Sequence, residues 1–327
     1  MPNTSFARIS FTMNKLSIAK KIRALFNGNT SLDDLSYLLS NKESIPPKGA
    51  PDLDRFREII SDPLNLLIKR VPSAGMTKGE YVTLHNGNVV KYKGGSYYGK
   101  YSEILVINRG VHEPLEEYVF QQLLDFIKNS SIAPIMLELG AYWGHYSMWA
   151  QSVVPETRTI LVEPDKKNNE IGRQNFKANR FEGTFLNDFV GTKYFAVDGF
   201  MASQNISRLT ILHSDIQGYE QEMLEGASHA LDNHQIEHVF LSTHSDALHA
   251  ACKSNLTDKG YVVMADADVS SQTTSCDGFI YATLPNLASC LSLPSLYLGR
   301  TEIPRLNTAQ VLEYLQSIHK TTQPSHS

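Results

Sequence analysis

The sequence predicts a doubly wound α/β fold with a mainly parallel sheet, preceded by an N-terminal helical and β-hairpin extension. Over residues 131–284, short apolar runs alternate with segments of helical periodicity, as a parallel sheet requires. Two of these runs, at 135–137 and 160–162, are each followed at once by a glutamate. In an open α/β sheet, ligands bind at the carboxyl ends of the strands. The pattern therefore places a ligand site beside these two acidic residues.

The N-terminal part has its own local patterns. Residues 31–40 are predicted as a helix with Ser31 as N-cap, and residues 52–61 as a second helix. The pair Asn86-Gly87 lies between the β-rich runs 81–85 and 88–92. Asparagine followed by glycine suits a two-residue hairpin turn, so a β-hairpin is expected there.

The remaining elements follow in chain order. A helix is expected over 115–129, before the first strand, and another over 308–319, near the C-terminus. A loop rich in serine and threonine separates the last two strands, which suggests that this pair is antiparallel. The expected strands are 135–138, 159–163, 184–188, 209–214, 237–242, 260–265 and 278–284.

Composition excludes several classes of protein. The formal net charge of −4 gives no sign of a nucleic-acid partner. No apolar run approaches the roughly 20 residues of a membrane helix, and the first residues lack the apolar centre of a secretory signal. The spacing of Cys252, Cys276 and Cys290 fits neither a zinc site nor a disulfide framework, so a cytoplasmic location is expected. Homo-oligomer formation is left open.

The turn after the first strand indicates the kind of ligand. Gly140 and Gly144 flank a turn that enters a helix, where backbone N–H groups are free to meet a ligand. A dinucleotide fingerprint needs a second glycine where this chain has Tyr142, so NAD is disfavoured. Glu138 before this glycine spacing is instead typical of the first motif of S-adenosylmethionine (SAM) methyltransferases. Glu163, at the end of the second strand, suits the two ribose hydroxyls of a nucleoside.

A second informative stretch is residues 209–220. It is expected as a strand that ends at Asp215, a turn at Gly218 and a helix. His213 and Asp215 are two residues apart, so alternation predicts that they share one side of the strand. The next strand ends at His244. Five side chains are thereby predicted at one rim of the sheet: Glu138, Glu163, Asp188, Asp215 and His244.

With these motifs, the chain resembles the FkbM family of SAM-dependent methyltransferases. The family pattern Asp-Val-Gly-Ala-Asn-x-Gly-x-Tyr-Ser is met by residues 138–147, and Lys-Ile-Asp-Val-Glu-Gly-x-Glu by residues 213–220. Residues 197–201 resemble the segment before the second motif. The chain departs from the family at three positions: Tyr142 replaces asparagine, Gln217 replaces glutamate and His213 replaces lysine.

The resemblance implies a class I methyltransferase (Rossmann-like) seven-stranded sheet in residues 101–327. Residues 1–100 lie outside the resemblance, and because every cofactor motif lies after residue 130 they are predicted to serve acceptor recognition or assembly. The resemblance also implies O-methylation of a hydroxyl on a small molecule, sugar or natural product, and hence a role in natural product biosynthesis. In this reaction SAM is converted to S-adenosylhomocysteine (SAH). Asp188 falls where such enzymes contact the adenine amino group. The cofactor-binding residues implied are Glu138, Gly140, Ala141, Tyr142, Gly144, Tyr146, Glu163 and Asp188.

The chemistry leaves alternatives open. Methyl transfer to a hydroxyl needs positioning and a base, and His213 or His244 could be that base. A divalent ion held by His213, Asp215 and His244 would serve the same purpose. Otherwise His213 is simply hydrogen-bonded in the sheet and His244 caps a turn. Two other functions remain: N-methylation of an amine or peptide, and a non-catalytic SAM-fold binding module.

Overall fold

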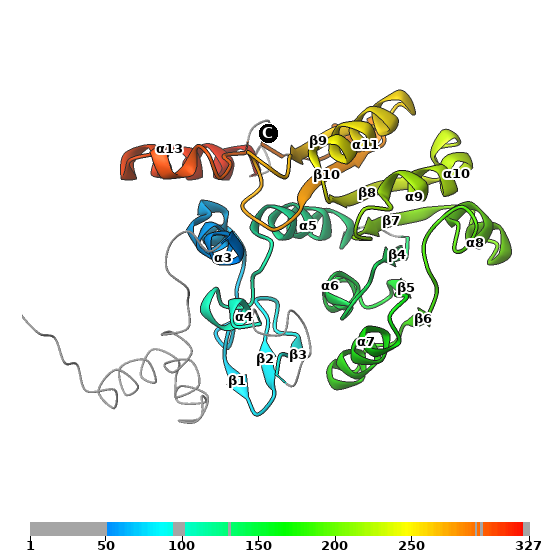
Figure 1. Ribbon diagram of the computed structural model, residues 1–327, viewed down its shortest axis with the longest axis horizontal. Helices are drawn as coiled ribbons and strands as arrows, with labels where there is room; N and C mark the ends of the chain where they lie inside the picture. Colours follow the sequence, from blue (N-terminus) through cyan, green and yellow to red (C-terminus); the bar gives the residue numbers. More distant parts are fainter. Residues whose placement is uncertain (1–50, 94–101, 130–131, 292, 295–296, 323–327) are drawn as a thin grey trace, which may run out of the picture.

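The computed structural model describes residues 51–93, 102–129, 132–291, 293–294 and 297–322, and Figure 1 shows their arrangement. The helix expected over 31–40 lies outside these residues. A seven-stranded sheet with the order β6-β5-β4-β7-β8-β10-β9 forms the centre of the molecule. Its strands are β4 (Ile135–Leu139), β5 (Arg158–Val162), β6 (Thr184–Leu186), β7 (Leu209–Ser214), β8 (Ile236–Thr243), β9 (Val262–Ala267) and β10 (Gly278–Thr283).

The strand directions determine which segments meet at the edge of the sheet where β4 to β8 end. Strands β4 to β8 are parallel to one another, whereas β10 is antiparallel to both β8 and β9. The start of β10 therefore lies at the edge where β8 ends, with Gly278 paired to Thr243. This is the seven-stranded topology expected from the sequence, including the antiparallel last pair, and all seven predicted strands are confirmed.

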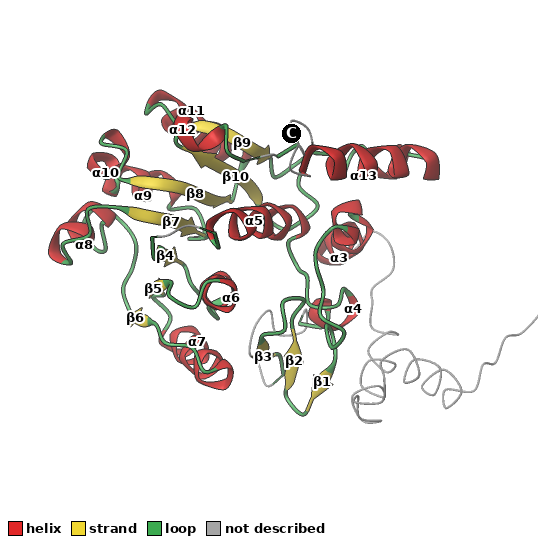
Figure 2. Cartoon of the chain, turned by 180° about the vertical axis from the view of Figure 1, so that it is seen from behind, coloured by secondary structure: helices red, strands yellow, loops and turns green. Residues whose placement is uncertain are grey.

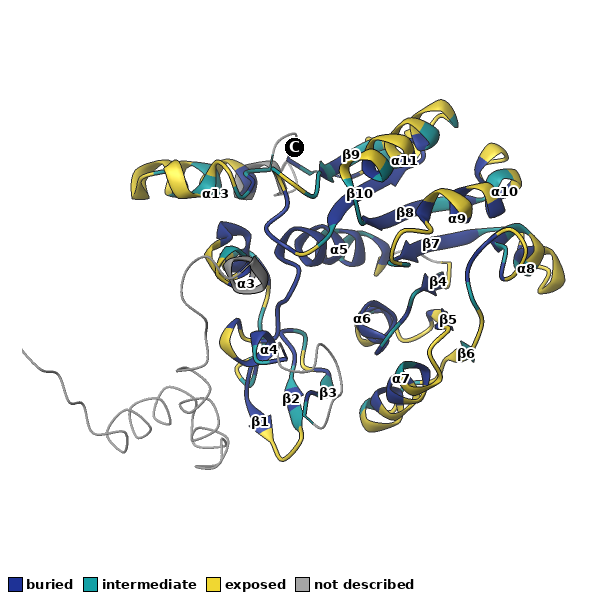
Figure 3. Ribbon diagram, viewed as in Figure 1, coloured by how far each residue is buried: buried dark blue, intermediate teal, exposed yellow. Residues whose placement is uncertain are grey.

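Helices cover both faces of the sheet, giving three layers (Figure 2). One face packs against α5 (Pro114–Ile127), α6 (His145–Val153) and α7 (Lys166–Asn179). The other face packs against α8 (Val197–Ser203), α9 (Glu220–Gly226), α10 (Ser228–Asp232) and α11 (Asp246–Asp258). Figure 3 shows the central strands as the most deeply buried part of this arrangement.

Alternation along the strands sorts side chains between the two faces. Leu212 of β7 packs toward α8–α11, while its neighbour Ile211 packs toward α5 and α6. Phe240 and Tyr281 are fully buried on the α5 side and contact each other, with ring centroids 4.5 Å apart. A side chain on this side of β7 thus faces α5, which fixes where His213 must lie.

The N-terminal part is a small antiparallel sheet packed against the helices. It contains β1 (Thr77–Lys78), β2 (Tyr81–Thr83) and β3 (Val89–Lys91), preceded by α3 (Pro51–Ser61) and η2 (Pro63–Leu66) and followed by α4 (Ile104–Ile107). The predicted hairpin at Asn86-Gly87 is confirmed, with Gly87 at φ 95°. The sequence pattern did not predict the third strand, β1, because two residues carry no periodicity.

The chain ends with α12 (Pro285–Ala288), η4 (Ile303–Arg305) and α13 (Thr308–Thr322), the last of which confirms the predicted C-terminal helix. Ile318 of α13 is buried in the same apolar cluster as α5. No helix within the described residues has the length and apolar character needed to cross a bilayer.

Candidate active site

The turn between β4 and α6 is built from left-handed backbone. Gly140, Tyr142 and Gly144 have φ values of 68°, 46° and 77°. A Cβ atom on Gly140 would lie 1.6 Å from the carbonyl oxygen of Asp215, so no other residue fits there without moving the chain. The turn after β4 and the end of β7 therefore pack backbone against backbone, which brings the two sequence motifs together.

Tyr142 stands where the family pattern has asparagine. Asparagine tolerates left-handed backbone better than tyrosine does, so the substitution carries some strain. A hydrogen bond offsets it, because the Tyr142 N–H donates to Glu163 Oε2 over 3.0 Å. The other oxygen of Glu163 accepts the N–H of Asp165 over 2.8 Å, and burial raises the pKa of this carboxyl. Glu163 thus holds the turn from the neighbouring strand.

Glu138 and Tyr146 are buried on either side of the same turn. Glu138 Oε2 accepts the N–H of Ser147 over 3.0 Å, and burial raises its pKa. The Tyr146 hydroxyl donates to Glu113 Oε2 over 2.7 Å, and its ring lies 4.1 Å from that of His213. The Ala141 N–H donates to the carbonyl of Val162 over 3.0 Å. These bonds fix both ends of the turn.

The residues at this turn fit a nucleoside cofactor. Each oxygen of Glu163 accepts one backbone N–H, and a carboxylate has about four acceptor positions, so capacity remains for ribose hydroxyls. Asp188 follows β6 at the same edge of the sheet and is exposed. These residues lie at the carboxyl ends of β4, β5 and β6, the edge at which ligands bind in open α/β sheets.

A second group of side chains converges at the ends of β7 and β8. His244 Nδ1 lies 2.6 Å from Glu220 Oε1, while its Nε2 lies 3.2 Å from Asp215 Oδ1 and 3.3 Å from Asp277 Oδ1. Glu220 is fully buried at the start of α9, and Asp277 immediately precedes β10. We call Asp215, His244 and Asp277 the rim triad; their ligand atoms lie within 4.8 Å of one another.

The proton affinities of the rim triad follow from its surroundings. Burial alone would lower the pKa of His244, but its bonds to Asp215 and Glu220 and the charge of Asp277 raise it to about 10. Burial, together with the charge of Asp215, raises the pKa of Asp277 to about 7. At neutral pH the imidazole is therefore a cation, and Asp277 is close to its midpoint of titration.

His213 is not part of this group, contrary to the predicted convergence of His213, Asp215 and His244. His213 Nε2 lies 2.6 Å from Glu116 Oε1, and burial lowers its pKa. The reason is geometric. His213 is still inside β7 and points toward α5, whereas β7 ends at Ser214 and Asp215 already belongs to the turn. Strand alternation does not extend across that turn, so Asp215 meets His244 without His213.

Several carboxyl groups near this rim repel one another. Burial, together with the charge of Asp215, raises the pKa of Glu113 to about 7 and that of Glu116 to about 8. The charges of Glu113 and Glu116 in turn raise the pKa of Asp277. Ser242 and His213 each contact Glu116, at 3.0 Å and 2.6 Å. Carboxyl groups therefore dominate the charge of this region, and a cationic ligand would relieve the repulsion among them.

Three of these residues carry roles that sequence patterns did not predict. Asp277 could have been found, because an antiparallel strand starts at the edge where its parallel neighbours end. Glu116 and Glu220 are buried at helix starts, and a carboxylate there is ordinarily a solvated residue of the first turn. Their burial depends on packing between distant elements, which no local signal reports.

The chain is similar to several solved methyltransferase structures, each with a TM-score below 0.5. Among solved structures, similarity extends to a SAM-dependent methyltransferase from Agrobacterium tumefaciens (13% identity, covering 63% of this chain and 70% of that one, TM-score 0.43). It also extends to precorrin-6y C5,15-methyltransferase from Geobacter metallireducens (15% identity, covering 51% of this chain and 88% of that one, TM-score 0.38). A third similar structure is tRNA (uracil-54, C5)-methyltransferase from Pyrococcus abyssi (10% identity, covering 51% of this chain and 38% of that one, TM-score 0.35). No curated protein matches the chain.

The family described as methyltransferase FkbM domain matches residues 159–263. The matched segment runs from β5 to β9 and contains Glu163, Asp188, the end of β7 and His244. The resemblance drawn from the two sequence motifs is thereby confirmed. Over residues 159–263 the chain is thus similar to the methyltransferase FkbM domain, and this match supports a SAM-dependent methyltransferase.

Proposed function

We propose that this protein transfers a methyl group from SAM to a hydroxyl of a small molecule, such as a sugar or another natural product, and releases SAH. The observation that carries the proposal is the rim triad, which sets a carboxylate with a pKa of about 7 beside the cofactor turn. A hydroxyl must lose its proton as it is methylated, whereas a neutral amine is already nucleophilic. A proton acceptor tuned to neutral pH is therefore most useful to an O-methyltransferase.

The cofactor is assigned to the turn after β4 and to the acids that follow β5 and β6. In the proposal Glu163 accepts the ribose hydroxyls, Asp188 the adenine amino group, and Gly140–Gly144 lets the cofactor lie against the backbone. SAM supplies an electrophilic methyl group on a positively charged sulfur. Glu113, Glu116 and Asp215 repel one another, and a cation placed beside them would be favoured electrostatically.

The proton is assigned to Asp277, with His244 as its partner. His244 is a cation held by Glu220, so its Nε2 side presents an N–H toward Asp215 and Asp277. The acceptor hydroxyl would donate to the Asp277 carboxylate while the imidazolium stabilises the developing negative charge on oxygen. This assigns the base to the carboxylate and the electrostatic role to the histidine, rather than making either His213 or His244 the base.

A divalent ion is the alternative activator of the hydroxyl. Its ligands would be Asp215, His244 and Asp277, a donor set of one nitrogen and two carboxylates that suits several divalent ions. Turnover measured with and without EDTA separates the two versions. Turnover that survives EDTA supports proton transfer to Asp277. If EDTA abolishes turnover and Mg²⁺ or Mn²⁺ restores it, a bound divalent ion activates the hydroxyl instead.

Calorimetry with SAH tests the cofactor assignment. We expect SAH to bind and NAD not to, and Glu163→Ala to weaken SAH binding by about 1–3 kcal/mol because a charged hydrogen-bond partner is lost. Glu170→Ala, which removes an exposed carboxylate on α7, is the matched control and should leave the affinity unchanged. Tight NAD binding without SAH binding would contradict the proposal.

Detection of SAH release with a panel of acceptors tests the reaction. The panel pairs each hydroxyl compound with the amine of the same skeleton. We expect turnover with hydroxyls to exceed turnover with the matched amines. The reverse preference would make the enzyme an N-methyltransferase, and SAH binding without turnover on any acceptor would favour a binding module.

A further inference from the structure

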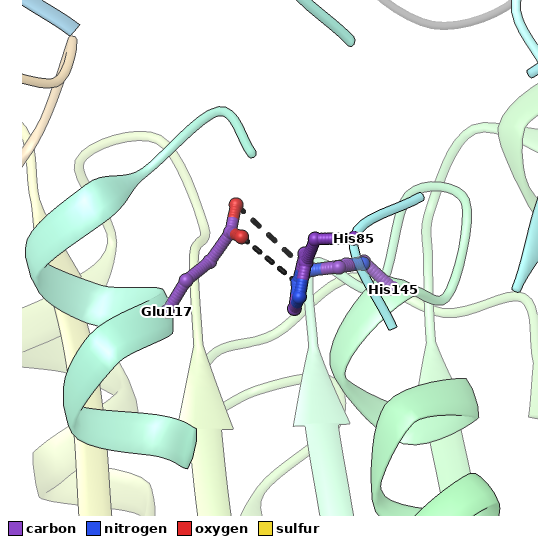
Figure 4. Close-up of side chains that lie close together, drawn as sticks. All are labelled: His85, Glu117 and His145. Carbon is purple, nitrogen blue, oxygen red and sulfur yellow. Dashed lines mark ion pairs between the residues drawn. The ribbon is translucent and has the colours of Figure 1, made fainter. Parts of the chain in front are cut away.

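A second cluster of histidines and a carboxylate lies outside the rim triad and takes no part in the proposed reaction. It consists of His85, Glu117 and His145, which come from three separate elements (Figure 4). His85 follows β2 in the N-terminal hairpin, Glu117 is in the first turn of α5, and His145 is the first residue of α6. Their side chains are 1%, 0% and 3% exposed, respectively.

The three side chains are close enough to share one ion. His85 Nε2 lies 3.0 Å from Glu117 Oε2, and His145 Nε2 lies 4.0 Å from Glu117 Oε1. One ligand atom from each residue falls within 4.8 Å of the other two. Tetrahedral zinc with bonds of about 2.0–2.1 Å separates its ligand atoms by about 3.3 Å, which lies within the observed range.

Both histidines have ring nitrogens with no hydrogen-bond partner in the part of the chain that the structure describes. This holds for Nδ1 and Nε2 of His145 and for Nδ1 of His85. The Nε2 atom of His85 is paired with Glu117 Oε2 over 3.0 Å. Buried polar atoms almost always find a partner, so these nitrogens are the feature that calls for a ligand.

The carboxylate of Glu117 is held in place by a second set of contacts. Its Oε1 accepts the backbone N–H groups of His112 and Glu113 over 2.8 Å and 3.1 Å. His112 Nδ1 lies 2.6 Å from the same oxygen. Outer contacts of this kind orient the ligands of protein metal sites. They also leave Oε2 of Glu117 facing His85.

We propose that His85, Glu117 and His145 bind a divalent transition-metal ion of the Zn²⁺ class. Two histidines and one glutamate are a known ligand set for zinc, with a fourth position left for water. The ion would join the N-terminal hairpin to α5 and to the start of α6, directly after the cofactor turn. Its role is structural: it fixes the hairpin against the helix that carries His145 and Tyr146.

The first test uses the unaltered full-length chain. After incubation with excess Zn²⁺ and removal of unbound ion, elemental analysis is expected to find one zinc per chain. X-ray absorption is expected to show nitrogen and oxygen ligands at about 2.0–2.1 Å and no sulfur. The zinc-loaded protein should melt at a higher temperature than the chelated protein, because the ion binds only the folded chain. A chain that remains free of zinc overturns the proposal.

Variants then locate the ion. His145→Gln and His85→Gln should each lose most of the bound zinc, measured on protein whose far-ultraviolet circular dichroism matches that of the unaltered chain. His244→Gln, which alters the rim triad, should retain it. Zinc kept by His145→Gln but lost by His244→Gln would assign the ion to the rim triad and overturn the proposal. If the cluster variants do not fold, His244→Gln still decides the question: zinc retained by this variant supports the proposal, and zinc lost from it assigns the ion to the rim triad.

Discussion

His213 lies in β7 and His244 directly follows the neighbouring strand β8, yet their surroundings shift their pKa values in opposite directions. His213 is buried among Tyr146, Phe240 and Glu116, and burial lowers its pKa. His244 lies at the rim with a carboxylate on each side of its ring, and these partners outweigh burial and raise its pKa to about 10. The same residue type is therefore neutral in one place and cationic in the other. Only the second can stabilise a developing negative charge at neutral pH.

The proposed division of roles predicts a bell-shaped pH–rate profile. The rate should rise as Asp277 loses its proton near pH 7, because its carboxylate must accept the acceptor's proton. The rate should fall near pH 10, where His244 loses the proton that stabilises the transition state. Initial rates of SAH release at saturating SAM measure the profile. A profile that stays flat between pH 6 and 8 would contradict the role of Asp277.

Substitutions at these two residues should separate catalysis from binding. Asp277→Asn is expected to lower kcat by about 10²–10⁴-fold and to remove the limb near pH 7. His244→Gln is expected to lower kcat by about 10²–10³-fold and to remove the limb near pH 10. SAH affinity should change little in either. His229→Gln, at an exposed position on α10, is the control and should leave kcat unchanged.

At the scale of elements, the turn between β4 and α6 depends on close packing with the end of β7. Because the backbone of Asp215 occupies the space beside Gly140, the first motif and the second motif cannot move independently. The turn is also tied to β5 through Glu163 and Tyr142. The turn after β4, Glu163 and Asp215 therefore pack as one unit, although they are far apart in sequence.

Gly140→Ala tests this packing. The added Cβ would overlap the carbonyl of Asp215 and would sit on left-handed backbone, so we expect loss of SAH binding and a decrease in the free energy of unfolding of about 1–3 kcal/mol. Gly199→Ala is the matched control. Gly199 lies inside α8 with open space around it, so alanine should be neutral or stabilise by about 0.5–1 kcal/mol. Urea denaturation and calorimetry measure both. Equal effects of the two substitutions would contradict the argument.

The strands of the central sheet could be predicted from sequence because their signals are local. Apolar runs such as 135–137 and 160–162, each closed by a polar residue, mark a strand and its carboxyl end together. The same logic placed Asp215 and His244 at one rim, where the structure has them 3.2 Å apart. The partners Glu220 and Asp277 could not be predicted in this way, because their positions depend on how α9 and β10 pack.

At the scale of the whole molecule, the N-terminal sheet and the large sheet share one core. Val82, Leu84 and Val90 pack in the same apolar cluster as Trp143 and Phe176. Asn179 of α7 hydrogen-bonds both the N–H and the carbonyl of Val89, each over 2.7 Å. The boundary predicted near residue 100 follows a change in sequence character, but the described residues on its two sides do not form separate cores. The position of such a shared core is not visible in local patterns.

Asn179→Ala therefore tests whether the two parts unfold together. The substitution removes two hydrogen bonds between α7 and β3, and we expect the free energy of unfolding to fall by about 1–3 kcal/mol. Unfolding in urea should remain a single transition, because one apolar cluster spans both sheets. Gln174→Ala, which removes an exposed amide on the same helix, is the control and should change stability by less than about 0.5 kcal/mol.

Circular dichroism and tryptophan fluorescence, the latter reporting on Trp143 and Trp149, should give coincident unfolding curves in both variants. Two separate transitions would instead show that the N-terminal sheet is an independent domain, and the ion proposed at His85, Glu117 and His145 would then have to hold that domain in place by itself.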